Sequence, residues 1–162
     1  MSLFYAVVVL VAAQALTTES SKSQPATAEF LSQAEREMLD LVNGERSKAG
    51  LPPLRASRQL TEAARGHAAN MARQRILNHT LDGKTFDQRI TATGYRYSFA
   101  GENIYLGPSA AQAMAFWMRS PGHQRNLLSP EYQEIGLGMT PGNTRQQYWT
   151  QVFATPAAGP PK

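Results

Sequence analysis

Two strand-like segments near the C-terminus constrain the fold of this chain more than any other feature. Residues 135–139 alternate large apolar side chains with Gly136 and Gly138, the pattern of a strand that another backbone approaches closely. Residues 148–153, with the sequence Tyr-Trp-Thr-Gln-Val-Phe, form a second such segment. Residues 141–144 between them include Pro, Gly and Asn, which are typical of turns. The sequence therefore predicts an antiparallel hairpin.

Helix-like segments precede this hairpin. Apolar side chains recur in them at three- and four-residue steps, and Ser32, Ser57 and Ser109 stand where a helix N-cap is expected. Ser32 and Glu35 also have the spacing of a capping box. Helices ahead of strands within 162 residues predict one α+β domain built in layers. The expected helices run from Ser32 to Gly50, from Ser57 to about Leu77, from Phe86 to Gly94, and from Ser109 to Pro121.

The first residues predict export. Residues 1–15 form an apolar run that ends in Ala-Gln-Ala, a pattern typical of a signal-peptidase site. The run is shorter than the roughly 20 residues that a membrane span needs, so we expect no transmembrane span; a packed N-terminal helix is the alternative. We expect a flexible lead-in over 16–29, the domain over 30–155 and a tail over 156–162. The protein would then be secreted, to the periplasm or the extracellular space.

Composition narrows the possible partners and cofactors. The chain has no cysteine, which excludes a disulfide frame, a thiolate metal site and a thiol nucleophile. Its 16 Lys and Arg against 12 Asp and Glu give a net charge of +4, which favours anionic surroundings such as cell-wall polymers or lipid headgroups. Because the basic residues are scattered singly, without interleaved stacking aromatics, we expect no nucleic-acid partner.

Three polar residues that are far apart in the sequence are the candidate functional residues. His79 follows the second expected helix, Glu102 lies in Ala-Gly-Glu-Asn-Ile, and His123 lies in Ser-Pro-Gly-His-Gln-Arg-Asn. They stand among Gly, Pro and Asn rather than on an apolar period, which is where functional side chains occur more often than packing ones. We expect the three to meet in one cleft.

Three roles fit this trio. Two imidazoles and a carboxylate are suitable zinc ligands, and three protein ligands with one open position form the arrangement that activates water. Without a metal, the same side chains could transfer protons, because histidine titrates near neutral pH. In the structural alternative, the carboxylate accepts hydrogen bonds from both histidines and from backbone amides, and so fastens loops together.

The order of motifs resembles the CAP superfamily of cysteine-rich secretory, antigen 5 and pathogenesis-related 1 proteins, and within it the cysteine-free bacterial branch. The resemblance covers roughly residues 34–153. It implies a three-layer α-β-α sandwich with a small antiparallel sheet, and a secreted protein. The motifs are Asn-His-Thr at 78–80, Gly-Glu-Asn-Ile at 101–104, Trp-Met-Arg-Ser-Pro-Gly-His-Gln-Arg-Asn-Leu-Leu at 117–128, Glu-Ile-Gly-Leu-Gly at 134–138, and the second strand of the hairpin.

The resemblance also implies a cleft. In the eukaryotic branch this cleft carries two histidines and two glutamates, and in some members it binds a divalent metal. His79 and Glu102 match the first histidine and the first of those acids. Ser120 and Tyr148 stand where the second glutamate and the second histidine would be, and the bacterial pattern offers His123 instead.

These observations predict a secreted CAP-domain protein with a polar His/Glu cleft. It would act as a binding or structural module for a lipid, sterol or glycan of the cell envelope or a host surface. The alternative is a metal-dependent extracellular hydrolase that cleaves peptide or cell-wall bonds, with the same trio as catalytic residues and zinc ligands. Tyr148, Asn126 and Ser120 are further candidates for ligand binding.

Other polar and aromatic residues are expected to serve the core. His67 lies on the alanine-rich stripe of the second helix, and we expect it to be a buried, hydrogen-bonded residue. Trp117 and Trp149 have the spacing of core residues, with an aromatic-lined ligand groove as the alternative.

Overall fold

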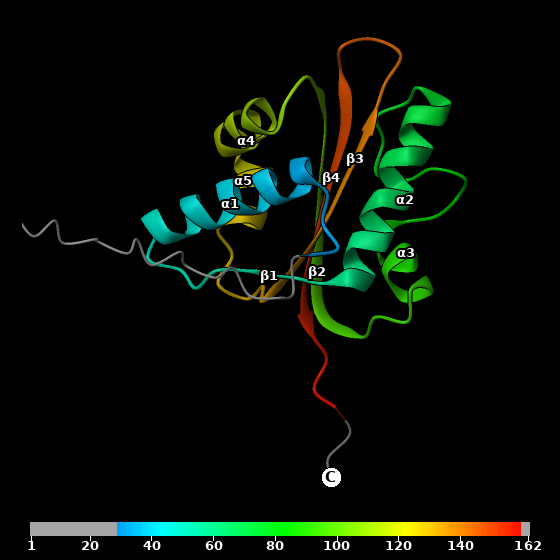
Figure 1. Cartoon of the computed structure of the whole chain (residues 1–162). Helices are drawn as coiled ribbons and strands as arrows, with labels where there is room; N and C mark the ends of the chain where they lie inside the picture. Colours follow the sequence, from blue (N-terminus) through cyan, green and yellow to red (C-terminus); the bar gives the residue numbers. More distant parts are fainter. Residues whose placement is uncertain (1–28, 160–162) are drawn as a thin grey trace, which may run out of the picture.

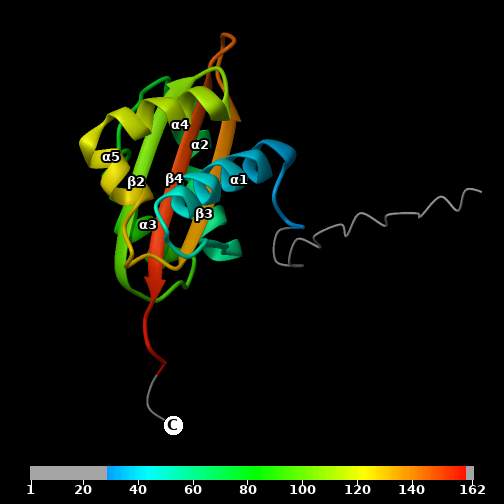
Figure 2. The same cartoon turned by 90° about the vertical axis from the view of Figure 1, so that its left-hand side faces the viewer.

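The computed structural model describes residues 29–159, which form three layers (Figure 1). A four-stranded sheet lies between two groups of helices (Figures 1 and 2). The α-β-α sandwich expected from the sequence is confirmed. One face of the sheet is covered by α1 (Gln33–Lys48), α4 (Ala110–Arg119) and α5 (Pro121–Leu127), and the other by α2 (Arg58–Gln74) and α3 (Phe86–Ala92).

The described range leaves out part of the predicted organisation. The predicted leader, residues 1–15, and all but the last residue of the lead-in lie outside it, as do the last three residues of the predicted tail. These boundaries stay predictions. No helix among residues 29–159 combines the length and the apolar character that crossing a membrane requires.

The sheet contains the predicted hairpin. Strand β3 (Glu134–Pro141) pairs antiparallel with β4 (Gln147–Pro156), and β2 (Tyr97–Gly107) pairs antiparallel with the other side of β4. The short β1 (Arg55–Ala56) lies parallel to β3 and pairs with its first residues, so the strand order is β1-β3-β4-β2. This order puts β2 at an edge of the sheet.

The glycines of β3 let α2 lie directly on the sheet. A Cβ on Gly136 would lie 2.0 Å from the backbone carbon of Leu60, and one on Gly138 would lie 2.4 Å from that of Ala64. Such distances are shorter than van der Waals contact, so only residues without a side chain fit there. The close backbone approach expected from the Gly-x-Gly alternation is confirmed, and it fixes α2 against the sheet.

The helix ends follow the expected caps, with two differences. Ser32 and Glu35 form the capping box of α1, and the side chains of Ser57 and Ser109 cap α2 and α4. Helix α2 ends at Gln74 rather than near residue 77, because the following residue adopts a left-handed conformation.

The second difference concerns Pro121, which does more than end α4. It occupies the first position of α5. The backbone N–H at this position has no partner within a helix, so the missing N–H of proline costs no hydrogen bond. His123 therefore lies in a short helix. The helix gives its side chain a fixed orientation relative to β2.

One buried cation holds the end of α5. Arg46 is 1% exposed, and its guanidinium donates to the carbonyl oxygens of Pro52, Leu127 and Ser129 at 2.8–3.0 Å. Carbonyl groups at the end of a helix lack partners within the helix, and they carry the negative end of its dipole. Arg46 thereby ties α1 to the segment that carries His123 and Asn126.

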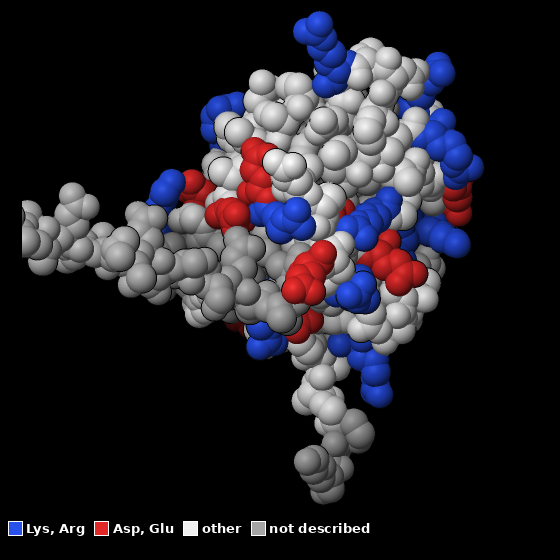
Figure 3. All heavy atoms as spheres, in the orientation of Figure 1, with Lys and Arg blue, Asp and Glu red and all other residues white. Residues whose placement is uncertain are grey.

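The surface in the orientation of Figure 1 mixes charges of both signs. Figure 3 shows Lys and Arg interspersed with Asp and Glu over this face. Interspersed charges do not produce the single-sign field that steers a polyanion onto a surface. The expected absence of a nucleic-acid partner stays a prediction.

We expect a methyl group added to β3 to destabilise the protein far more than one added to α2, the helix that packs on β3. Gly136→Ala should lower the free energy of unfolding by about 3 kcal/mol, because two backbones would have to separate. The matched control is Gly66→Ala on α2, where a Cβ meets no atom within 4 Å; it should stabilise the protein by about 0.5–1 kcal/mol. Urea unfolding of both variants measures the difference, and equal stabilities would contradict the close approach.

Candidate functional site

The site is built around one buried carboxylate on the edge strand. Glu102 lies on β2, on the sheet face that α2 and α3 cover, and its side chain is 1% exposed. Its Oε2 accepts a hydrogen bond from Nη2 of Arg89 at 2.5 Å, and its Oε1 lies 2.9 Å from Nδ1 of His79. A buried carboxylate is tolerated when it is paired and hydrogen-bonded, and both oxygens of Glu102 meet this condition.

Arg89 connects the loop after α2, which carries His79, to strand β2. It lies on α3, its side chain is 12% exposed, and its Nη1 donates at 2.9 Å to the backbone oxygens of both His79 and Lys84. A single guanidinium therefore holds the loop after α2 and the acid on β2 in a fixed relation. The planar fork of arginine provides these several donors at once, which lysine does not.

His67 faces the same carboxylate from α2. It is 1% exposed, as expected for a core residue, and its Nε2 lies 3.9 Å from Oε1 of Glu102. The expected hydrogen bond is absent: within residues 29–159, neither ring nitrogen finds a partner of hydrogen-bond geometry. Burial lowers the pKa of His67, and the Glu102 carboxylate opposes this effect.

The opposite face of β2 is joined to α5 by amide side chains. Asn103 is fully buried, and its Nδ2 donates to the backbone oxygen of His123 and to Oε1 of Gln151, each at 3.2 Å. Asn126 donates to Oδ1 of Asn103 at 2.9 Å and to the backbone oxygen of Glu102 at 3.2 Å. The two asparagines thus link strand to helix, whereas an asparagine in a loop more commonly binds its own backbone.

His123 is anchored by Ser120 and packs beside an aromatic ring. Its Nδ1 lies 2.8 Å from Oγ of Ser120, and its ring centroid lies 5.7 Å from that of Phe116. Burial lowers the pKa of His123, and the neighbouring charge of His79 adds to this effect. Ser120, a predicted ligand-binding residue, therefore orients the imidazole.

His79 and His123 line one hollow of about 500 Å³ at the end of β2. Its other walls are mainly apolar: Leu77 and Phe116 are 44% and 42% exposed, and Ile104 forms part of the floor. A second hollow of about 460 Å³ lies on the other side of His79 and includes Glu102, Asn126, Asp87 and Thr85. Apolar walls with a few convergent polar groups are typical of ligand sites.

The structure joins two members of the predicted trio directly. His79 and Glu102 are in contact, whereas His123 lies across the hollow from His79 and is bonded to Ser120. Within residues 29–159, no group of three or more His, Cys, Asp or Glu side chains is arranged to hold a metal ion. The proposed roles in catalysis and zinc binding stay predictions.

Tyr148 lies apart from these residues. Its side chain packs with Met71, Leu81 and Ile104 on the α2 face of the sheet, and it lines a smaller hollow of about 150 Å³ near the β3–β4 turn. It shares that face with Val152, as the strand alternation predicts. Its role in ligand binding also stays a prediction.

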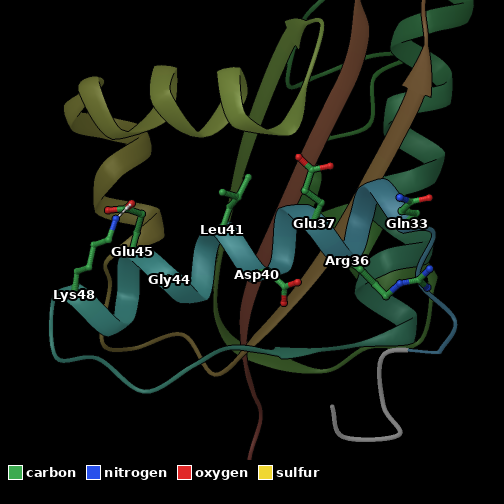
Figure 4. Close-up of a pocket in the computed structure, with 8 residues that line it drawn as sticks. All are labelled: Gln33, Arg36, Glu37, Asp40, Leu41, Gly44, Glu45 and Lys48. Carbon is green, nitrogen blue, oxygen red and sulfur yellow. Dashed lines mark hydrogen bonds and ion pairs between the residues drawn. The ribbon is translucent and has the colours of Figure 1, made fainter. Parts of the chain in front are cut away.

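A hollow of about 580 Å³ runs along α1, but its chemistry is unlike that of a binding site. It is lined by residues of this one helix, and Figure 4 shows Glu37 and Leu41 pointing toward α4 while Arg36 and Asp40 point the other way. Lys48 and Glu45 pair with each other at 2.7 Å. The polar groups do not converge, so we place the candidate site at β2.

Sequence reasoning missed Arg89 and the position of His67. Arg89 lies in a seven-residue helix beside a buried isoleucine, and nothing in that spacing indicates which acid it would meet. His67 lies at helical spacing among buried alanines, so its burial was predictable. Its proximity to Glu102 depends on how α2 crosses β2, which is a property of the tertiary structure.

Comparison with protein families gives a match over most of the chain. The model of the CAP (cysteine-rich secretory protein) family matches residues 39–153. YkwD of Bacillus subtilis is 31% identical over 140 residues, which is 85% of this chain and 53% of YkwD. The membrane protein YlbC of the same organism is 31% identical over 125 residues, 74% of this chain and 34% of YlbC. The chain thus spans about half or less of the length of these relatives.

Solved structures share the fold. An extracellular protein of Bacillus anthracis that contains an SCP domain has a TM-score of 0.69 and 28% identity, covering 75% of this chain and 40% of that protein. An outer surface protein of Borrelia burgdorferi has a TM-score of 0.71 and 21% identity, covering 75% of this chain and 91% of that protein. The second likeness concerns the fold alone.

The two histidines whose pKa is lowered by burial, His67 and His123, should make stability depend on pH. Because the folded protein lowers the pKa of His67, the unfolded chain binds a proton first as the pH falls below about 6.5. The free energy of unfolding should therefore decrease below that pH. It should decrease less in His67→Gln, because this variant lacks the titrating ring, and His123→Gln should have an effect of the same sign.

Denaturant unfolding between about pH 7.5 and about pH 5 measures this dependence relative to the wild type. The quantity to compare is the slope of the unfolding free energy against pH. Unlike the absolute stability, this slope does not contain the packing effect of each substitution. If the variant and the wild type lost stability in parallel, the assignment to His67 would be wrong.

Proposed function

This chain belongs to the CAP (cysteine-rich secretory protein) family, and from that premise we propose that it is an extracellular binding module. Its ligand is a lipid, sterol or glycan of the cell envelope or of a host surface, held in the hollow between His79 and His123. The observation that carries the proposal is the composition of this hollow, in which two imidazoles face a space walled by exposed apolar side chains.

The two imidazoles can contribute hydrogen bonds without a metal. A carboxylate only accepts, so His79 donates its Nδ1 proton to Glu102 and, when neutral, keeps Nε2 as an acceptor. The side chain of His79 is 50% exposed and lines the hollow, so a ligand there can reach its ring. In this proposal Glu102 is a positioning residue, because it acts by orienting His79 and does not itself contact the ligand.

An extracellular location has two kinds of support. The predicted leader at residues 1–15 is typical of exported chains. One similar structure, at 28% identity, is that of an extracellular protein. The net charge of +4 also suits surroundings that contain anionic envelope polymers.

The alternative function, zinc-dependent hydrolysis, fits these residues poorly. Both oxygens of Glu102 are engaged, and the guanidinium 2.5 Å from Oε2 places a positive charge where the metal would bind. One ring nitrogen of His123 is also engaged, with Ser120. A zinc ion would have to displace Arg89 and so release the loop that Arg89 holds.

We expect Phe116→Ala to weaken ligand binding about tenfold, because it removes an exposed aromatic wall without touching the buried core. The probes are phosphatidylglycerol vesicles, cholesterol, and an oligomer of β-1,4-linked N-acetylglucosamine, each titrated against the wild-type protein. Ile76→Ala is the matched control, since Ile76 is 46% exposed but does not line the hollow. Failure of all three probes to bind, or equal losses in both variants, would contradict the proposal.

Zinc titration distinguishes the alternative. From the ion pairs around Glu102 we expect zinc binding to the wild type to be weak and unchanged by His79→Ala or His123→Ala. Isothermal titration calorimetry, with elemental analysis of the purified protein, measures this. Stoichiometric zinc that either substitution weakens would favour the hydrolase.

A further inference from the structure

The hollows beside His79 are parts of a longer feature that follows the edge strand. A third hollow of about 500 Å³ lies next to Phe99, near the start of β2. It shares Asn126 with the hollow that contains Glu102, and that hollow shares His79 with the one that contains His123. The three are therefore adjacent and are lined in turn by the first, middle and last parts of β2.

These three hollows together form a groove along β2, and the groove is longer than a single small ligand needs. The first and last residues of β2 that line it are Phe99 and Leu106, which are seven steps of ~3.4 Å apart, or about 24 Å. An exposed aromatic ring stands near each end, because Phe99 is 48% exposed and Phe116 is 42% exposed. Such a shape fits an extended polymer.

Phe99 is held as a rigid platform. Its ring stacks on Tyr132 with centroids 5.2 Å apart and planes at 27°, and Tyr132 stacks on the buried Phe153 at 5.4 Å. One face of Phe99 is thus packed, and nearly half of the side chain meets solvent. A fixed ring with a free face loses little conformational entropy when a flat ligand stacks on it.

The edge of β2 argues against a peptide as the polymer. A peptide that adds a strand needs free backbone groups along the edge. Here the backbone oxygen of Glu102 accepts from Asn126 at 3.2 Å, and that of Ile104 accepts from Nε1 of Trp117 at 3.1 Å. Side chains of α4 and α5 occupy these acceptors, so a strand could pair only by displacing them.

The charges along the groove argue against a polyanion. Arg125 lines one end and Asp87 lines the middle, while Glu102 is neutralised by Arg89. A polyanion requires a row of unpaired cations. The remaining groups are amides, hydroxyls and imidazoles, including Gln124, Asn126 and Ser129, which suit uncharged hydroxyl and acetamido groups.

We infer that the groove along β2 binds a linear, uncharged glycan chain, with sugar rings stacked on Phe99 and Phe116 and the middle of the chain beside His79. This inference rests on the proposed binding function, and it adds the ligand class and the Phe99 end of the site. The apolar C–H face of a pyranose ring packs on an aromatic face, while its equatorial hydroxyls point outward to the polar walls.

The test uses oligomers of β-1,4-linked N-acetylglucosamine from the dimer to the hexamer, titrated by calorimetry into the full chain. We expect affinity to rise at least about tenfold from dimer to hexamer. Phe99→Ala and Phe116→Ala should each weaken the hexamer about tenfold and reduce the dependence on length. Both side chains are largely exposed, so thermal melting should show both variants folded, and Ile76→Ala is the control.

Each other outcome has a defined meaning. Glycan binding that depends on Phe116 but not on Phe99 or on oligomer length would overturn the extended groove and leave the proposed function intact. Binding of phosphatidylglycerol vesicles or cholesterol, but of no glycan, would also overturn this inference and leave the proposed function intact. If none of these probes binds, the proposed function and this inference both fail.

Discussion

The pairing of Glu102 with Arg89 and His79 is the interaction on which the site depends. Three consecutive elements of the chain meet at this carboxylate: the loop after α2 through His79, α3 through Arg89, and β2 through Glu102 itself. A buried charge is destabilising unless it is paired, so the folded state requires all three to be in place. The contact with Glu102 therefore holds His79 in place, although its side chain is half exposed.

The other wall of the site is fixed by neutral groups. Asn103 and Asn126 connect β2 to α5, and Arg46 connects α5 to α1 through backbone carbonyls. In a chain without cysteine, these buried polar contacts hold elements together, as disulfides do in many small secreted domains. Because the contacts are directional, they set the distance between His79 and His123 as well as the stability.

The sequence predicted those parts of the fold that depend on residues close together in the chain. The hairpin followed from the Gly-x-Gly alternation, and the start of α1 from the Ser32 and Glu35 capping box. His79 and Glu102, which the sequence predicted to meet in one cleft, are in contact, while the role of that cleft stays a prediction. Arg89 and His67 could not be placed, because their partners are set by the packing of α2 and α3 on the sheet. The helical position of His123 depended on Pro121, which begins a helix as readily as it ends one.

The distribution of charge at the site favours a neutral ligand over a cation. Where the resemblance to the eukaryotic branch would place a second acid, Ser120 is bonded to an imidazole whose pKa is lowered by burial. Glu102, the acid that does match that branch, has its negative charge balanced by Arg89. A cation entering the hollow would lose its hydration without meeting an unpaired anion, which is unfavourable. A ligand with hydroxyl and amide groups meets imidazole and amide partners there and leaves the ion pair intact.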